Sequence, residues 1–587
     1  YMVSGIQNRK INTLFFYENS LIGLLAFFPG ILLGMLISQI LEAVLLNMFG
    51  LPYMLHLGFS LPALGLTFLY FSAMLLFSIR KNGKWICRVQ LRDLLYYDRK
   101  TENSSVSGNI SAVSIFLLSV FCCVAGFLLI CIQPLGKGYD ILVGIVFLLL
   151  FLFGFFISTS AFLVTYFGNR SDWKYRKQRL ITFRDFTGKI HSTSTVMGIL
   201  SILFMLAITF GGIGTTVGLM AARNVEASAF DVLILHPGEQ YDFSRYETII
   251  QKSFPLQSHT YEIYTGGKTD FLSVHDQTIV EAGRSVHRTY AEFEYDTYMA
   301  YSDYLKLREM LGYQSLELDP ALCYVHCVPA LEKSFKELIR KQDGLKCAGY
   351  SFATDGIFSE PFSQTNDYGN GADYVIIVPD HAVSQMQIVY SVYAAKTQTP
   401  LSPSDIQSII ADCGSLTLLE RMSAKTASSG APTAFMYEDM DYLSGKWADK
   451  AEFSYLYAMV ICLFYLAFIL EISAAAILAT QVLSDWQEKQ RQDRILRQLG
   501  MNEQLVYKLN NRQLLLLFLF PIFPSLLLSG CFISICAKKI LVLFFELPPT
   551  PDFLLIGQSL GISLVLFALI YGVYFVAAQI CYEHRRK

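Results

Sequence analysis

Residues 141–167 read ILVGIVFLLLFLFGFFISTSAFLVTYF, a run of 27 residues without a charged side chain. A helix of about 20 apolar residues is long enough to cross the hydrocarbon core of a bilayer. The run therefore predicts a membrane-spanning helix and places the chain among membrane proteins.

Seven more apolar runs of this kind occur along the 587 residues. The chain is 53% hydrophobic and only 16% charged, which is less charge than a soluble protein of this size carries. Eight buried helices of this length would need a core larger than one soluble domain builds, so a soluble protein is disfavoured. The predicted spans are residues 21–48, 58–79, 110–133, 141–167, 195–221, 454–480, 514–537 and 553–579.

A hydrophilic block, residues 223–452, separates five predicted spans from the three that follow. Within it, FDVLILHP and ADYVIIVPD have the apolar, β-branched pattern of strands. Residues 331–340 have the pattern of a helix, and SPSDIQSIIADCG predicts another helix with Ser402 or Ser404 as its cap. The predicted fold class is a polytopic α-helical membrane protein with eight visible spans and one α+β domain.

The block also has an unusual charge. It carries 18 Lys and Arg against 32 Asp and Glu, a net charge of −14, whereas the rest of the chain carries +12. A strongly acidic domain attracts cationic ligands over a distance that salt shortens. Acidic surfaces are also common in soluble domains, so an ordinary solvated surface is the alternative interpretation.

Lys and Arg gather in alternate loops between the predicted spans, whereas residues 49–57 have neither and residues 134–140 have one. The positive-inside rule places the basic loops in the cytoplasm. Counting spans from either end of the chain then places the acidic block outside the cell. The basic residues are Arg80, Lys81, Lys84, Arg88, Arg92, Arg99 and Lys100, then Arg170, Lys174, Arg176, Lys177, Arg179, Arg184 and Lys189, and finally Arg585, Arg586 and Lys587.

Familiar catalytic and nucleotide-binding motifs do not occur in the sequence. There is no GxxxxGK[ST] loop, no GxSxG and no HExxH, so no enzyme site and no nucleic-acid partner is predicted. The segment CYVHC contains Cys323, His326 and Cys327 but lacks a second ligand pair at zinc spacing, so no metal site is predicted. Together with Cys347 and Cys413, these cysteines allow disulfides whose pairing the sequence leaves open.

Residues 487–513 combine many charged side chains with a short apolar stripe. Ile495 and Leu499 lie one helical turn apart, and Leu496 joins the same stripe. This pattern predicts an amphipathic helix that lies on the membrane or docks to a partner. A plain helix beside the membrane is the alternative interpretation.

Glu471 lies inside the sixth predicted span. An acid in the membrane is costly to bury and is for that reason a candidate functional residue. A protonated or locally hydrogen-bonded group inside the helix bundle is the alternative.

The chain contains a weak internal repeat with an offset of 495 residues. SGIQNRKINTLFFYENSLIGLLAFFPGILLG at 4–34 matches LGMNEQLVYKLNNRQLLLLFLFPIFPSLLLSG at 499–530, with Gly5 opposite Gly500 and Pro29 opposite Pro524. Each copy has a glycine, a polar stretch, an apolar span with a proline, and one further span. The second copy keeps a span and a helix before Gly500, and the first copy has no counterpart of these before Gly5. We therefore expect missing sequence and ten spans in the intact protein.

These two segments, with EKQRQDRILRQLG at 488–500, resemble the FtsX-like permease family of ABC transporters. That family carries an R-x-x-E-I-x-x-L-R-x-L-G-like coupling helix, whose Glu is replaced here by Asp493 or Arg494. The residues that match the coupling helix are Arg491, Arg494, Ile495, Leu496, Arg497, Leu499 and Gly500, and the repeat counterparts are Gly5, Arg9 and Lys10.

The layout is similar to the bacitracin-resistance (BceB-type) permeases, which have ten spans and one outer domain between the seventh and eighth. The resemblance implies an incomplete first FtsX-like half (1–80), three central spans (81–222), an extracellular domain (223–452) and a second FtsX-like half (453–587). It implies no catalytic residue and no cofactor in this chain, because ATP and Mg²⁺ belong to a dimeric cytoplasmic ABC ATPase.

The same resemblance implies mechanotransmission, in which ATP-driven helix movement reshapes the outer domain. Its ligand would be a cationic peptide antibiotic or a lipid-linked wall precursor, for antibiotic resistance or sensing. A membrane sensor histidine kinase would be a further partner, in the cell membrane of a Gram-positive bacterium. The alternatives are a lipoprotein- or lipid-releasing permease and a membrane scaffold that regulates cell-wall hydrolases.

Overall fold

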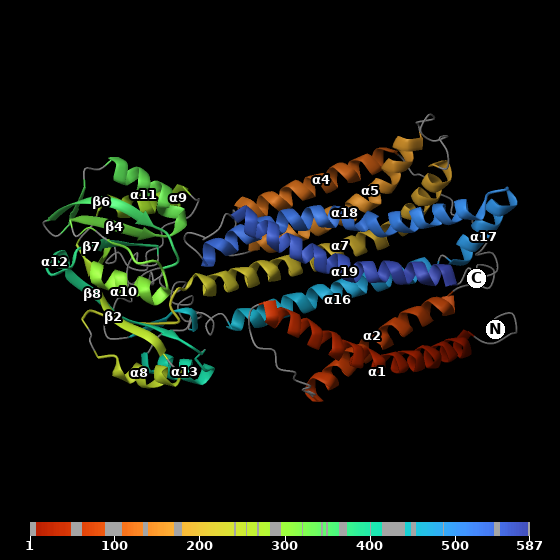
Figure 1. Ribbon diagram of the computed structural model, residues 1–587. Coiled ribbons are helices and arrows are strands. Elements are labelled where there is room, and N and C mark those ends of the chain that lie inside the picture. Colours follow the sequence, from red (N-terminus) through yellow and green to blue (C-terminus); the bar gives the residue numbers. More distant parts are fainter. Residues whose placement is uncertain are drawn as a thin grey trace. The chain divides into compact units, whose positions relative to one another are not determined.

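The protein is a polytopic membrane protein with a separate mixed-sheet domain, and the computed structural model in Figure 1 confirms the predicted fold class at this level. Among the residues that the structure describes, eight helices are long and apolar enough to cross a membrane. They are α1 (Asn8–Met48), α2 (Leu61–Arg88), α4 (Asn109–Ile132), α5 (Tyr139–Gly168), α7 (Arg179–Ala227), α16 (Ser454–Ser484), α18 (Glu503–Phe544) and α19 (Asp552–His584).

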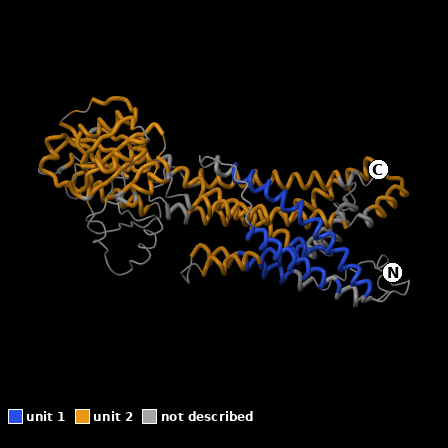
Figure 2. The backbone as a smooth tube through the Cα atoms, turned by 90° about the horizontal axis from the view of Figure 1, so that it is seen from below, with its two compact units in different colours: residues 1–123, 150–198 blue, residues 124–149, 199–587 orange. Residues whose placement is uncertain are grey.

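The structure describes residues 8–48, 61–88, 109–132, 139–168, 179–239, 242–253, 255–266, 269–281, 295–317, 319, 321–341, 344–347, 350–362, 373–399, 401–413, 441–447, 454–484, 486–544 and 552–584. The chain divides into two compact units, coloured in Figure 2. The first comprises Tyr1–Cys123 and Leu150–Gly198, and the second comprises Val124–Leu149 and Ile199–Lys587.

The two copies of the internal repeat form helices with matching bounds. Adding 495 to the bounds of α1 gives 503–543, and α18 covers 503–544. The same shift moves α2 to 556–583, and α19 covers 552–584. The shared order of elements therefore extends to the lengths of the helices.

The helix contacts inside each copy also correspond. Within the first unit, α1 packs on α2 where a Cβ on Gly23 would lie 2.8 Å from the side chain of Leu75. The shifted positions are 518 and 570, and within the second unit Phe518 packs on Tyr571 with ring centroids 5.5 Å apart. The Tyr571 hydroxyl also donates to the Phe518 carbonyl oxygen at 3.0 Å.

In the second unit, hydroxyl groups connect α7 to α18. Ser525 Oγ lies 2.7 Å from Ser201 Oγ and 2.8 Å from the Ser201 carbonyl oxygen. One helical turn further along α18, the Ser529 hydroxyl donates to the Met205 carbonyl oxygen at 3.0 Å. In an apolar surrounding such side-chain bonds to a neighbouring backbone help to fix the register of two helices.

A second set of hydroxyl groups connects α7 to α19. Thr215 Oγ1 lies 3.1 Å from the Ser559 carbonyl oxygen. Ser563 donates its hydroxyl proton to the Ile208 carbonyl oxygen at 3.3 Å. Serines spaced by four residues on α18 and on α19 therefore bind the same central helix from two sides.

Small residues on α7 permit this close approach. A Cβ on Gly212 would overlap the side chain of Ile533 on α18, and a Cβ on Gly211 would lie 3.0 Å from the Ser563 hydroxyl. A Cβ on Gly214 would lie 3.2 Å from the ring of Phe464 on α16. The sequence GGIG at 211–214 thus lets three helices surround α7 at short distance.

The separate domain, called the head here, is built on one mixed sheet. Among the described residues nine strands follow the order β5-β6-β4-β7-β3-β2-β8-β1-β9. Their bounds are β1 (Val232–Pro237), β2 (Pro255–Thr265), β3 (Thr297–Ala300), β4 (Leu322–Cys327), β5 (Leu345–Cys347), β6 (Tyr350–Phe358), β7 (Tyr374–Val378), β8 (Gln387–Thr397) and β9 (Tyr442–Ser444). The predicted strands FDVLILHP and ADYVIIVPD are confirmed as β1 and β7.

Four of these strands form a recognisable motif. In the order β9-β1-β8-β2 every neighbouring pair is antiparallel, and in the register Ile234 lies opposite Tyr393. Helix α8 (Ser244–Ile250) lies between β1 and β2 in the chain, and α13 (Pro403–Cys413) lies between β8 and β9. This is the β-α-β-β-α-β arrangement of ferredoxin-like domains, with the segment from α9 to β7 inserted between β2 and β8.

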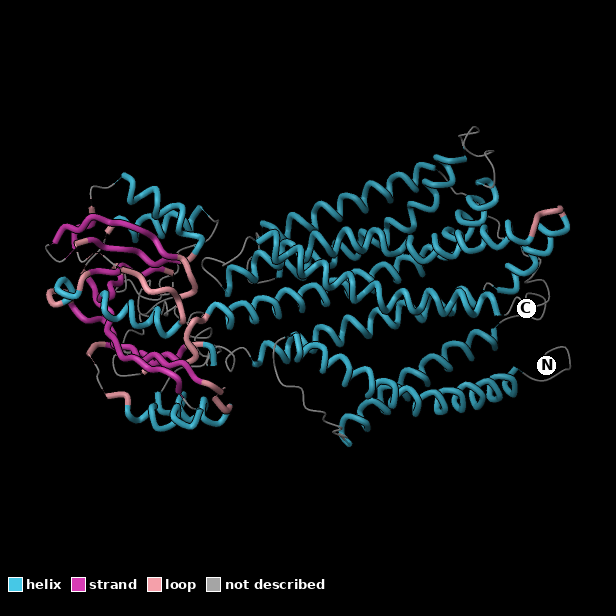
Figure 3. Tube along the Cα trace, viewed as in Figure 1, coloured by secondary structure: helices cyan, strands magenta, loops and turns pink. Residues whose placement is uncertain are grey.

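Helices cover both faces of the sheet. Alternate side chains of a strand point to opposite faces, so both faces carry apolar side chains that pack against helices. On one face α10 (Tyr301–Leu311) buries Tyr304 and Leu307 among side chains such as Leu233 and Val392. On the other face α9 (Asp270–Glu281) and α11 (Pro329–Lys341) cover β3, β4 and β7, while α8 and α13 cover β1 and β8 (Figures 1 and 3).

Two predicted helices of the head are confirmed. Residues 331–340 lie inside α11. Helix α13 begins after Ser402, whose oxygen accepts the Asp405 N–H at 3.2 Å and whose hydroxyl donates to the Asp405 carboxylate at 2.6 Å. Ser402, rather than Ser404, therefore caps this helix.

A buried polar network joins α9 to the strands β3 and β7. His275 is buried, with Nε2 2.9 Å from Asp373 Oδ2 and Nδ1 3.1 Å from Asp276 Oδ1. Burial alone would lower the pKa of His275, but these two carboxylates outweigh it and raise the pKa to about 9. Beside them, the buried Asp296 accepts the Tyr374 hydroxyl at 2.5 Å.

This network makes head stability depend on pH. Because the pKa of His275 rises from 6.5 unfolded to about 9 folded, its stabilisation is full below pH 6.5 and is lost as pH rises through about 9. We expect the head to lose about 3 kcal/mol over this window. Amide exchange of peptides from α9 and β7, corrected for intrinsic exchange rates, measures this change in the full chain. The His275→Gln variant should have a lower free energy of unfolding, and this free energy should not change between pH 6.5 and about 9. If its pH dependence equals that of the wild type, His275 is not the group responsible.

Candidate functional site

The predicted amphipathic segment is two helices, not one. Helix α17 (Trp486–Gln498) ends at a turn, and α18 begins at Glu503. The prediction of one amphipathic helix over 487–513 is therefore wrong, and the coupling role of this segment stays a prediction. The reason is backbone geometry: Gly500 has φ +85°, a left-handed conformation that ends a helix and that glycine adopts without strain.

Hydrogen bonds complete this turn on both sides. The Gly500 N–H donates to the Arg497 carbonyl oxygen at 2.9 Å, and the Met501 N–H donates to the Leu496 carbonyl oxygen at 3.1 Å. This pair of bonds is a Schellman motif, which satisfies carbonyl groups that a helix end leaves free. Asn502 then starts α18, since its carbonyl oxygen accepts the N–H groups of the first turn of that helix.

A side-chain pair fixes the angle between the two helices. Asn510 of α18 is buried, and its Nδ2 lies 3.0 Å and 2.9 Å from the two carboxylate oxygens of Asp493 on α17. Arg497 and Glu503 form an exposed ion pair at 3.2 Å, which contributes little because water screens it. Asp493, a candidate for the position of the family's glutamate, is thus bound inside its own chain.

The elbow, defined as α17, the turn at 499–502 and the first two turns of α18, exposes apolar side chains. Leu499 at the turn is 75% exposed and Ile495 is 49% exposed. Leu496 is half-buried, and Arg491, Arg494 and Arg497 are exposed. The structure therefore brings the predicted coupling residues together at one tip, with leucine and isoleucine among arginines.

The structure describes only part of the repeat counterparts Gly5, Arg9 and Lys10. Gly5 lies outside the described residues. Arg9 and Lys10 lie in the first turn of α1, where the Lys10 side chain is exposed and only the backbone of Arg9 is described.

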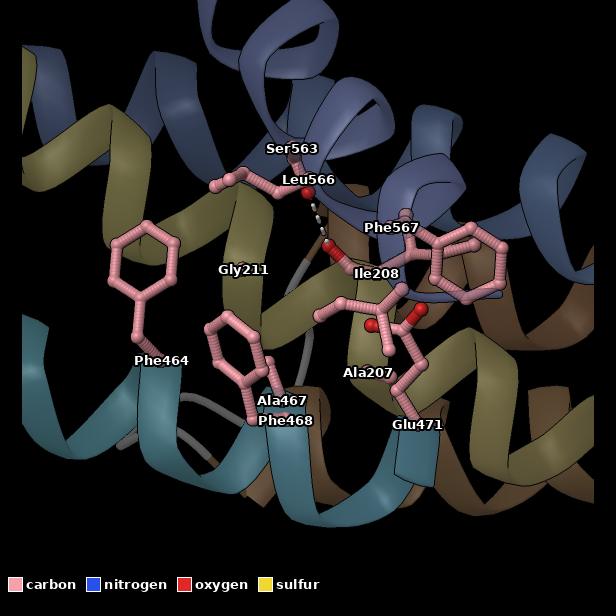
Figure 4. Close-up of a pocket in the computed structure, with 11 residues that line it drawn as sticks. Ala207, Ile208, Gly211, Phe464, Ala467, Phe468, Glu471, Ser563, Leu566 and Phe567 are labelled. Carbon is pink, nitrogen blue, oxygen red and sulfur yellow. Dashed lines mark hydrogen bonds between the residues drawn. The ribbon is translucent and has the colours of Figure 1, made fainter. Parts of the chain in front are cut away.

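Glu471, the predicted intramembrane acid, lies in α16 and is only 4% exposed. It lines a small cavity with side chains of α7 and α19, and its carboxylate points away from α16 toward Ile208 and Phe567 (Figure 4). Its Oε1 has no hydrogen-bond partner among the described residues.

The segment CYVHC forms β4, and its side chains alternate. Cys323 and Cys327 face α11, whereas His326 faces the opposite side, where its Nδ1 lies 2.7 Å from the Tyr304 hydroxyl. These three side chains therefore cannot bind one metal ion. Both cysteines are free thiols, and burial raises the pKa of Cys327 to about 12. The side chains of Cys347 and Cys413 lie outside the described residues.

The buried arginine that lies beside His326, Arg308, was not predicted from the sequence. Arg308 of α10 binds both carboxylate oxygens of Glu360 at 3.0 and 3.1 Å, and its guanidinium lies over the rings of Tyr304 and Phe358. Burial lowers the pKa of His326 to about 4, so the neutral ring donates from Nε2 to the Glu360 carbonyl oxygen at 2.7 Å. Arg308 and Glu360 are 52 residues apart in sequence, and their contact joins α10 to the segment that follows β6.

The sequence matches no protein-family model and no curated protein. The likeness to FtsX-like permeases therefore stays a prediction, which rests on the elbow residues and on the order of the spans. In the part of the chain that the structure describes, no group of three or more His, Cys, Asp or Glu side chains is placed to hold a metal ion.

The elbow should depend on Asn510. Asn510→Ala removes the donor that binds Asp493, and a hydrogen bond to a charged group contributes about 1.5–3 kcal/mol. We expect amide exchange in α17 to become about tenfold faster or more, since 1.4 kcal/mol is a factor of ten. Asn511→Ala, at the next position, is the matched control. Equal exchange rates in the two variants would show that the Asp493–Asn510 pair does not hold the elbow.

Proposed function

We propose that this chain is the permease subunit of an ABC transporter of the FtsX-like kind. The observation that carries the proposal is the elbow: a short helix held at a fixed angle to a membrane helix, with Leu499 exposed at its tip. An exposed apolar side chain among arginines suits a helix that docks into a groove of a partner protein. That partner is a cytoplasmic ABC ATPase dimer, which holds ATP and Mg²⁺.

The elbow is connected to the head along the chain, so a movement of the elbow can reach the head through α16. The chain leaves the head after β9, continues through the 31 residues of α16, about 46 Å of helix, and then enters α17. A second route uses α18, whose serines bind α7, and α7 leads directly into β1 of the head. A displacement of α17 by nucleotide binding therefore acts on both segments of chain that connect the head to the bundle.

The head is the ligand-binding part in this proposal, and it lies outside the cell. Its net charge of −14 favours cationic ligands, which supports a cationic peptide antibiotic or the lipid-linked wall precursor that such a peptide binds. The chain then serves antimicrobial-peptide resistance or sensing, together with a sensor histidine kinase in the membrane of a Gram-positive bacterium.

Leu499→Asp tests the ATPase contact. A charge at the exposed tip would have to be buried in an apolar groove, and we expect a loss of about 2 kcal/mol, or about 30-fold in affinity for the ATPase. The measurement is ATP hydrolysis stimulated by the permease in nanodiscs, titrated with the ATPase. Gln498→Asp places the same charge at the neighbouring exposed position and is the control. Full stimulation by the Leu499 variant would remove the elbow from the coupling role.

Binding of a cationic peptide to the full chain tests the charge of the head. The Debye length falls from about 30 Å at 0.01 M salt to about 8 Å at 0.15 M, so the dissociation constant should rise steeply over this range. Calorimetry with a cationic peptide and with a neutral analogue of the same length separates charge from shape. A dissociation constant that does not change with salt would leave the acidic surface as an ordinary solvated one.

A further inference from the structure

Glu471 is a buried acid with one carboxylate oxygen left unpaired among the described residues. It lies near the middle of α16, with 4% of its surface exposed, and Oε1 has no hydrogen-bond partner among the described residues. Leaving a charged carboxylate unpaired in an apolar surrounding costs several kcal/mol, and a buried acid responds by binding a proton.

The cavity beside Glu471 is formed by three helices of one unit. Ala207, Ile208 and Gly211 come from α7, and Ser563 and Phe567 come from α19. The centre of a water molecule can occupy about 20 Å³ of this cavity, which is room for about one water. Figure 4 shows the Ser563 hydroxyl bonded to the Ile208 carbonyl oxygen, so this hydroxyl proton is already used.

Among the described residues, no basic side chain lines this cavity. The lining residues from α7, α16 and α19 include no Lys, Arg or His. In the described part of the chain, Tyr571 of α19 also faces Glu471, and its hydroxyl donates to the Phe518 carbonyl oxygen at 3.0 Å. A hard metal cation needs about six oxygen ligands, and the lining offers the carboxylate and one hydroxyl. A proton is the cation that this site fits.

We propose that Glu471 is a proton-binding site whose occupancy is linked to the packing of α16 against α7 and α19. In the closed arrangement of these helices the carboxyl carries its proton. When α16 moves away and water enters the cavity, the carboxylate is solvated and the proton leaves to that water. By linkage, low pH favours the closed arrangement and high pH favours the open one. This inference does not require the proposed ATPase.

Infrared difference spectroscopy tests whether Glu471 titrates in its bundle. The full chain in lipid nanodiscs is taken from acidic to alkaline pH, and the carbonyl band of a protonated carboxyl in an apolar surrounding is followed. We expect loss of this band on alkalinisation, and we expect the band to be missing in Glu471→Gln. Glu503→Gln, which neutralises an exposed acid of α18, is the control that should leave the band unchanged. A band that persists at every pH, or a wild-type spectrum without it, would overturn the proposal.

Thermal unfolding tests the link to packing. Glutamine has nearly the shape of a protonated glutamate and does not titrate, so Glu471→Gln should keep the closed bundle at every pH. We expect the difference between the unfolding temperatures of the wild type and the variant to become smaller as pH rises. Taking the difference cancels the contributions of His275 and of all other titrating groups, which the two proteins share. A difference that stays constant with pH would show that the proton has no part in helix packing.

Discussion

The packing of α7 against α18 and α19 is the constraint on which the rest of the structure depends. In a membrane, lipid is as apolar as leucine, so helices associate through close packing and hydrogen bonds rather than through the hydrophobic effect. Gly211 and Gly212 allow the approach, and hydroxyl groups such as those of Ser525 and Ser563 then bind nearby backbone carbonyls. Because α7 leads into the head and α18 carries the elbow, this packing joins the two parts with functional features.

The same dry interior explains why Glu471 stands out. Hydroxyl groups such as those of Thr215 and Ser529 bind carbonyl oxygens one helical turn away or on the adjacent helix, and they are satisfied at little cost. A carboxyl group has no equivalent arrangement there, because its charge needs water or a cation. In the two proposals made above, this acid makes helix packing sensitive to the proton, whereas the elbow makes it sensitive to a partner protein. Both act on the helices that flank the head.

Several elements followed from local sequence. The spans appear as helices because their apolar runs exceed the length of a buried helix, and α13 follows its serine cap. CYVHC was not predicted to be a strand; once it is one, the two-residue period makes His326 and Cys323 face apart. The break at Gly500 was harder to predict, because an apolar stripe at helical spacing continues up to Leu499 and the left-handed backbone conformation of Gly500 shows where the helix ends.

The sequence by itself determined that this is a multi-span membrane protein with one acidic α+β domain, because length, apolarity and charge are properties of single segments. Tertiary structure alone decided which residues meet. The bond between Asp493 and Asn510, the Arg308–Glu360 pair and the partners of α7 join positions separated by 17, 52 and more than 300 residues. No local pattern encodes such pairs, since each depends on how the whole chain closes around it.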